Sequence, residues 1–265
     1  MRRIAVGDVE VVSLLDGTER YPAARVYAEA GDALDGYARY QNDDGTVTLP
    51  FSSFLLRDGG LTVLVDTGNG PEVQGALIDD LREAGAKPAD VDVVVFTHLH
   101  GDHTGWNIDR ASGAAGFPNA RYLVPRGDWD HYRAAQPPPT SFVRDIEALE
   151  GLGVMELIEG GYTISPALST LHTPGHTPGH LSIAVSSGAA SACVIGDAFL
   201  TPIDVAEPDW VTSFDWSAPE VRRTRRELME RLDGTDTIVA ASHLPAPGLG
   251  RFAVTAEGRR FLPLP

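Results

Sequence analysis

The chain has 265 residues, 43% of them hydrophobic and 22% charged, so it can fold around a substantial core. Its formal net charge of −16 argues against a nucleic-acid partner, because phosphate binding needs clustered Lys and Arg. The single cysteine, Cys193, allows no disulfide within the chain, and no apolar stretch of signal-peptide or membrane-spanning length occurs, so we expect a cytoplasmic protein without a membrane segment.

The apolar pattern predicts strands that alternate with helices. Residues 4–16 contain two apolar runs separated by Gly7-Asp8, which predicts an opening hairpin. Residues 71–85 predict an amphipathic helix, because apolar residues recur at four-residue spacing after Pro71. Residues 91–96 form a Val-rich run typical of a strand covered on both faces. Further strands are expected over 51–57, 61–66, 121–125, 157–158, 162–164, 168–171, 181–185, 191–197 and 237–243, and further helices over 127–135 and 141–152.

Residues 17–50 lose this periodicity and collect Tyr21, Tyr27, Tyr37 and Tyr40 among polar residues, alanines and glycines. A segment of this length without regular structure is uncommon in a compact domain and is often functional. We expect an arm or lid over the active site or a contact in a homodimer, with a plain surface loop as the remaining alternative.

The last predicted helix begins near Ser217 and Glu220, which have the spacing of a capping box. Arginines at positions 222, 223, 225 and 226 could indicate nucleic-acid binding. Because glutamates interleave with them at helical ion-pair spacing, we interpret the run as a solvated helix face.

The two halves of the chain follow the same scheme. A strand ending near Asp66, a helix and a strand leading to His98 are matched by a strand ending at Asp197, a helix and a strand ending at His243. This repetition predicts an α/β fold, a four-layer α/β/β/α sandwich with internal duplication, which spans residues 1–265 as one domain.

A dense group of metal-ligand residue types follows the Val-rich strand. His98, His100, Asp102 and His103 lie within one short loop, and two positions apart in extended backbone point to the same side. Imidazole and carboxylate ligands without thiolate suit zinc, with iron, manganese or cobalt as alternatives. Two metals require an oxygen bridge, for which Asp197 is the candidate. We interpret His131 as a structural histidine, and spacing alone does not choose among His172, His176 and His180.

Five short motifs together resemble those of the metallo-β-lactamase-fold hydrolases. They are T-H-L-H-G-D-H at 97–103, V-D-T-G at 65–68, T-P-G-H at 173–176, G-D at 196–197 and S-H at 242–243. The resemblance implies one metal held by His98, His100 and His176 and another held by Asp102, His103 and His243, with Asp197 and a hydroxide between them. It also implies that Asp66 orients a ligand histidine, and that His172 and His180 lie behind the ligands or stabilise their loop.

Within that superfamily, the spacing from His176 to Asp197 and the sequence after His243 are most similar to methyl parathion hydrolase and its lactonase-like relatives. N-acyl-homoserine lactonases have a tyrosine three residues after the bridging aspartate, where this chain has Leu200. This departure leaves protonation of the leaving group to water or Asp102. Trp106, Phe199 and Leu200 lie near strand ends that should face the metals, so we expect them in an apolar substrate pocket.

The resemblance implies a hydrolase with two Zn²⁺ per chain, in which a metal-bridging hydroxide attacks an ester, lactone or phosphotriester of a small molecule. Asp102 and Asp197 are then the catalytic carboxylates. A glyoxalase II-like thioesterase is one alternative. The other is an iron-dependent oxidoreductase of the persulfide dioxygenase type.

Overall fold

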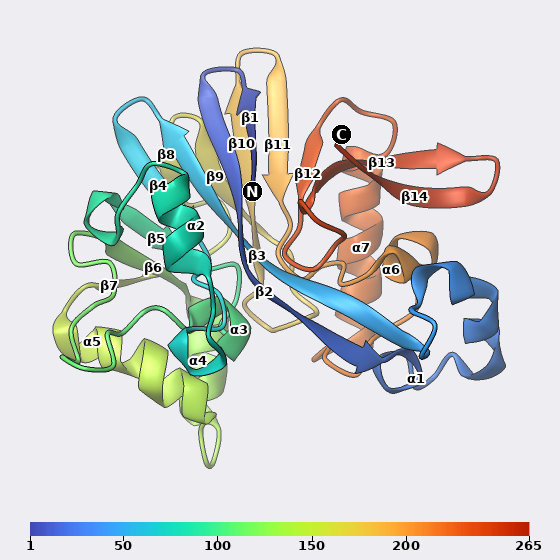
Figure 1. Cartoon of the computed structure of the whole chain (residues 1–265), viewed down its shortest axis with the longest axis horizontal. Helices are drawn as coiled ribbons and strands as arrows, with labels where there is room; N and C mark the ends of the chain where they lie inside the picture. Colours follow the sequence, from blue (N-terminus) through green and yellow to red (C-terminus); the bar gives the residue numbers. More distant parts are fainter. Residues whose placement is uncertain (265) are drawn as a thin grey trace.

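The computed structural model describes residues 1–264, which form two mixed seven-stranded sheets (Figure 1). The first sheet has its strands in chain order: β1 (Arg2–Val6), β2 (Val9–Pro22), β3 (Thr46–Asp58), β4 (Leu61–Val65), β5 (Val93–Val95), β6 (Arg121–Pro125) and β7 (Met155–Ile158). The second runs from β14 back to β8: β14 (Gly258–Pro263), β13 (Leu249–Thr255), β12 (Ile238–Ala240), β11 (Ala190–Val194), β10 (Leu181–Ser187), β9 (Leu168–His172) and β8 (Thr163–Ser165).

Each sheet changes from antiparallel to parallel pairing at the strand that precedes a crossover helix. Strand β4 pairs in parallel with β5 after helix α2 (Leu77–Glu83), and β11 pairs in parallel with β12 after α6 (Pro202–Ala206) and α7 (Ala218–Leu232). The predicted repetition of strand, helix and strand is thus present in both halves. Parallel strands require such a crossover, and it brings both carboxyl ends to the same edge.

Three apolar clusters separate four layers, as predicted for the fold. The central cluster joins the inner faces of both sheets and includes Val63 and Val93 from the first and Ile183 and Val194 from the second. A second cluster lies between the first sheet and the helices on its outer face, and a third lies between the second sheet and α7. The covering helices of the first sheet are α2, α4 (Arg126–Ala134) and α5 (Ala148–Leu152) (Figure 1).

Backbone hydrogen bonds also join the two sheets beside the strand ends. Leu181 N donates to Thr97 O at 2.7 Å, and Ser52 N donates to Ser242 O at 2.9 Å. Neither bond belongs to a regular strand ladder. They hold the carboxyl end of β5 against the amino end of β10, and β3 against the segment after β12.

The segment 17–50 is more regular than we expected. Strand β2 continues to Pro22 beyond a register shift between Leu15 and Gly17, and β3 begins at Thr46, so the two form a long ribbon. Between them lie α1 (Ala23–Val26) and a 3-10 helix (Gly31–Tyr40), which we call the arm. A small apolar cluster packs the arm against Ile203 of α6, in the second half (Figure 1).

The predicted helix 71–85 is wrong in its first part. A 3-10 turn (Pro71–Val73) ends at Gln74, which has a left-handed φ of 57°, and α2 begins only at Leu77. The cause is the buried carboxylate of Asp16, which accepts hydrogen bonds from Asn69 N and Leu77 N, both at 2.7 Å. The chain turns around this carboxylate, which occupies the amino end of α2 as a capping group.

Two expectations for α7 are also corrected. Ser217 occupies the N-cap position, but its side chain makes no capping hydrogen bond. Arg223 and Arg226 lie on the solvated face and pair with acidic side chains, as predicted. Arg225, however, is fully buried, because it points inward from the same helix. Glutamate spacing therefore described only part of the arginine run.

The other helical segments are a 3-10 turn (Pro88–Asp90), α3 (Gly101–Thr104) and a π-helix (Phe142–Glu147) that runs into α5. Within residues 1–264, no helix has the length and apolar character needed to cross a membrane.

Candidate metal centre

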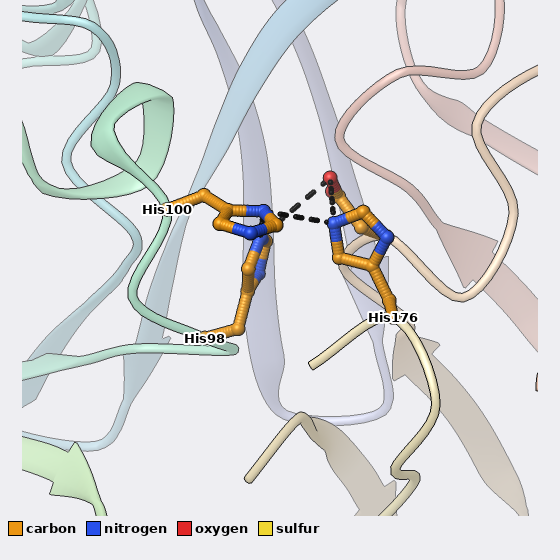
Figure 2. Close-up of side chains that lie close together, drawn as sticks. His98, His100 and His176 are labelled. Carbon is orange, nitrogen blue, oxygen red and sulfur yellow. Dashed lines mark hydrogen bonds and ion pairs between the residues drawn. The ribbon is translucent and has the colours of Figure 1, made fainter. Parts of the chain in front are cut away.

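Seven histidine and aspartate side chains from both halves converge where the strand ends meet. Ligand group A consists of His98, His100, His176 and Asp197, and ligand group B consists of Asp102, His103, Asp197 and His243. Within each group, one potential ligand atom per residue lies within 4.8 Å of every other. Figure 2 shows that His98 and His100, from the loop after β5, face His176, from the loop between β9 and β10.

The distances within group A are those of side chains aimed at one point. His98 Nε2 and His176 Nε2 lie 3.1 and 3.0 Å from His100 Nδ1. The carboxylate oxygen Oδ2 of Asp197 lies 3.3 Å from His176 Nε2. In group B, Asp197 lies 3.3 Å from His103 Nε2 and 3.0 Å from His243 Nε2. Asp197 therefore contacts both groups.

The donor set fits divalent metal ions. His103 Nε2 and Asp197 Oδ1 are buried, and neither has a hydrogen-bond partner within the described chain. An unpaired buried polar atom is costly. Metal coordination would satisfy these atoms, and nitrogen and oxygen donors without sulfur suit zinc and its neighbours in the first transition row.

Asp66 holds His103 from behind. Its Oδ2 lies 2.9 Å from His103 Nδ1 and accepts a hydrogen bond from Thr97 Oγ1 at 2.8 Å, while Oδ1 accepts one from Thr97 N. The backbone of Asp66 is left-handed, with φ of 61°, a conformation that non-glycine residues rarely adopt. Strain of this kind is typical of functional sites and is retained when the surroundings enforce it.

His176 and His243 have outer partners that the sequence pattern did not reveal. His176 Nδ1 lies 3.0 Å from Asp215 Oδ1, and His243 Nδ1 donates to the carbonyl oxygen of Pro50 at 2.7 Å. Such partners set the orientation and tautomer of ligand histidines. Asp215 lies between Phe214 and Trp216 in an irregular stretch, and Pro50 is distant in sequence, so neither offers a spacing signal.

The other two histidines of the 172–180 stretch lie outside both groups. His180 is buried behind the site, where its Nε2 accepts a hydrogen bond from Asp197 N and its Nδ1 contacts Thr173 Oγ1. His172 lies at the end of β9 and lines a different cavity. His180 therefore supports the backbone of Asp197.

Burial and neighbouring charges lower the pKa of some site histidines and raise the pKa of others. Burial lowers the pKa of His100 to about 4, and neighbouring His176 adds to this effect. Burial also disfavours protonation of His176 and His243, but the carboxylates beside them outweigh it and raise the pKa values to about 9 and about 10. For Asp197, nearby histidines outweigh burial and hold its pKa well below the usual range.

A cavity of about 530 Å³ opens over the ligands. Its walls include Tyr21, Leu49 and Phe51 from the β2–β3 ribbon, Leu200 and Phe214 from the second half, and Asn69, Glu72, Val73 and Arg144 from the first. The volume is that of a small-molecule site. The segment 17–50 thus reaches the cavity through its strands, which sequence reasoning placed in an irregular segment.

Two of the three expected pocket residues do not line this cavity. Leu200 does, as expected. Phe199, the residue before Leu200, turns into the core and packs edge-on against Phe252. Trp106 donates its Nε1–H to Asp16 and borders a separate cavity. Proximity to a strand end in the sequence therefore did not distinguish residues that line the cavity from residues that pack in the core behind it.

Solved structures resemble this fold along nearly its whole length. A structure of AidC, described as a dizinc quorum-quenching lactonase, superposes with a TM-score of 0.85 at 24% identity, covering 100% of this chain and 97% of that one. The hydrolase AbOPH, described as a member of the beta lactamase superfamily, gives a TM-score of 0.87 at 24% identity, covering 99% and 97%. At these identities the likeness concerns the fold.

Sequence relatives are similar over shorter ranges. Metallo-beta-lactamase domain-containing protein 1 of Xenopus laevis is 33% identical over 168 residues, which are 63% of this chain and 61% of that protein. An N-acyl homoserine lactonase of a Bacillus species is 32% identical over 161 residues, covering 52% and 59%. The chain thus spans about three-fifths of these curated relatives. The model of the metallo-beta-lactamase superfamily matches residues 48–243, most of the chain. The chain therefore belongs to the metallo-beta-lactamase superfamily.

Proposed function

We propose that this chain is a zinc-dependent hydrolase that uses two metal ions to cleave an ester, lactone or phosphotriester bond in a small, uncharged substrate. The observation that supports this most strongly is the pair of ligand groups that share Asp197 at the floor of a cavity. Both aspartic acids and all five histidines of the predicted ligand set take part in these groups. The similarity to the N-acyl homoserine lactonase of a Bacillus species supports the hydrolytic class.

Asp197 and Asp102 have different proposed roles, the first in binding metal and the second in contacting water in the cavity. When bound, two divalent ions supply Lewis acidity for the substrate oxygen and lower the pKa of a nucleophilic water. Asp197 would hold both ions, since its carboxylate faces both groups. Asp102 presents a carboxylate that is 26% exposed, so it can accept a hydrogen bond from water on the cavity side.

The cavity walls favour uncharged substrates. Within the described lining, the cationic side chain besides the histidines is Arg144, which pairs with Asp145 at 2.6 Å and lies 3.6 Å from Glu72. With its charge compensated, Arg144 offers little attraction to an anionic glutathione conjugate. This arrangement supports an ester, lactone or phosphotriester over a glyoxalase II-like thioester.

The leaving group would take its proton from water. Leu200 lines the cavity without a hydroxyl group, and the Tyr21 hydroxyl donates to Glu19 at 2.5 Å. No wall side chain in the described residues therefore offers an unengaged phenol. Substrates with good leaving groups, such as aryl esters and aryl phosphotriesters, should react fastest.

The test is a panel of lactones, aryl esters, phosphotriesters and glutathione thioesters, assayed with zinc-loaded protein whose metal content is measured in parallel. We expect hydrolysis of at least one uncharged class and slow turnover of the anionic thioester. Native protein that contains iron in both sites, with no hydrolysis after zinc loading, would instead favour the oxidoreductase.

A further inference from the structure

Arg225 is a buried charge that the proposed reaction does not use. Its side chain is 0% exposed in the middle of α7, although Arg223 on the same helix is solvated. Burying a guanidinium group is costly unless its charge is paired and its donors are bonded. The groups that contact Arg225 therefore indicate its structural role.

Two backbone carbonyl groups receive its donors. Nε donates to Ala198 O at 2.7 Å, and Nη1 donates to Trp210 O. Ala198 directly follows Asp197, the carboxylate shared by both ligand groups. This bond anchors the guanidinium group of Arg225, whereas the backbone N–H of Asp197 itself is held by His180.

A carboxylate links Arg225 to a ligand histidine. Arg225 Nη2 lies 3.7 Å from Asp215 Oδ2, while Asp215 Oδ1 lies 3.0 Å from His176 Nδ1. Both carboxylate oxygens are engaged, because Oδ2 also accepts a hydrogen bond from Thr212 N at 2.7 Å. Asp215 therefore lies between the guanidinium group, with which it forms an ion pair without a hydrogen bond, and the imidazole.

Helix α7 also shapes the loop that carries His176. Thr224 Oγ1 donates to Pro174 O, and Ser217 N donates to Gly175 O at 3.0 Å. A Cβ at Gly175 would lie 2.4 Å from Val221 N, so only glycine allows this contact. One helix thus positions both the loop backbone and, through Asp215, the His176 ring.

A second carboxylate extends the chain of contacts to the arm. Arg225 Nη1 lies 3.6 Å from Asp204 Oδ1, which accepts a hydrogen bond from Tyr27 Oη at 2.9 Å. Tyr27 follows α1 and is buried in the arm's apolar cluster. Arg225 therefore lies between the arm and ligand group A.

We propose that Arg225 is a positioning residue that, through Asp215, holds the His176 imidazole in its metal-binding orientation and strengthens binding at ligand group A. The inference rests on the proposed metal centre. It assigns no contact with substrate to Arg225, and its predicted effect is confined to one of the two ions.

The experiment measures zinc affinity rather than turnover. Metal-free protein is titrated with Zn²⁺ against a chromophoric chelator, and the Co²⁺ absorption spectrum is recorded for the same samples. The variants are Asp215→Asn, Arg225→Met, Arg225→Lys and the double variant Asp215→Asn/Arg225→Met. Arg223→Met is the matched control, since Arg223 lies on the same helix and pairs with exposed glutamates.

We expect Asp215→Asn and Arg225→Met to lower the affinity for one ion by about 10–100-fold, the range seen for residues that hydrogen-bond to metal ligands. The affinity for the other ion should not change. The double variant should lose no more than the stronger single variant, because both changes interrupt one contact chain. Arg225→Lys keeps the charge without the planar fork and should give a smaller loss of the same ion. Arg223→Met should match the unmodified protein.

Several outcomes would overturn the inference. Unchanged affinity for both ions in folded Asp215→Asn, or additive losses in the double variant, would show that Arg225 does not act through Asp215. If Arg225→Met does not fold, Arg225→Lys decides, and unchanged affinity there would also refute the role. Unmodified protein that binds fewer than two ions would contradict the proposed function itself, so the two failures are distinguishable.

Discussion

The first half of the molecule supplies its four ligands from one loop, whereas the second half supplies three from three separate loops. His98, His100, Asp102 and His103 follow β5 and continue into α3, with Asp66 and Thr97 directly behind them. His176, Asp197 and His243 each depend on a partner from elsewhere: Asp215, His180 and Pro50. In the compact loop, Asp66 reaches His103 directly and His98 through Thr97, whereas each dispersed ligand has a separate partner.

Asp197 belongs to both ligand groups, so its replacement should have the largest effect of all. We expect Asp197→Asn to reduce kcat/KM by more than about a hundredfold, beyond the loss typical of an outer partner. Metal analysis should show loss of both ions from this one change, and circular dichroism should show an unchanged fold. Unaltered turnover would refute the bridging role.

Asp66→Asn tests the carboxylate behind His103. We expect zinc bound at group B to weaken by about 10–100-fold, because His103 loses its charged partner. Group A should retain its ion, the reverse of the pattern expected for Asp215→Asn. If both variants release the same ion first, Asp66 and Asp215 do not support separate groups. Competition titration of the two variants side by side is the measurement.

The metal-free protein should lose stability on both sides of about pH 6.5. As the pH falls below 6.5, burial of neutral His100 and His180, with pKa values of about 4 and about 3, becomes increasingly costly. As it rises through about 9 and about 10, His176 and His243 lose the protons that their carboxylates favour. Urea unfolding at several pH values checks this, and a flat profile from pH 5 to 10 would contradict it.

Tyr27→Phe should have the smallest effect. It removes a buried hydroxyl group that contacts Thr201 and Asp204 at 2.6 and 2.9 Å, which costs about 1–3 kcal/mol of unfolding free energy. Both ions should remain bound with unchanged affinity, because Asp204 keeps its pairing with Arg225. Thermal unfolding of zinc-loaded protein measures the cost, and loss of an ion would show that the arm itself supports the ligands.

The sequence predicted the layers and the crossover scheme because apolar periodicity records which faces are covered. It also predicted the loop after β5, since four ligand types lie within one short stretch. His176 could be separated from His172 and His180 only by resemblance, and the structure brings His176 alone of the three into a ligand group.

What the sequence did not predict depends on contacts between distant segments. Nothing in the local sequence distinguishes Asp215 and Arg225, because their role depends on the packing of α7 against the His176 loop. The continuation of β2 and β3 depends on their pairing with each other, which the polar composition of 17–50 does not show. Asp16 interrupts a well-formed helical pattern from outside it.

The hydrogen bond from His243 Nδ1 to Pro50 O, together with the backbone bonds between the two sheets, has a consequence for the order of folding. Joining residues 50 and 243 closes most of the chain into a loop, a contact that is entropically costly and forms slowly. Ligand group B is therefore complete only after both sheets have docked. Metal would then bind after the two sheets have assembled and would stabilise the native state by mass action, because the ion binds only that state.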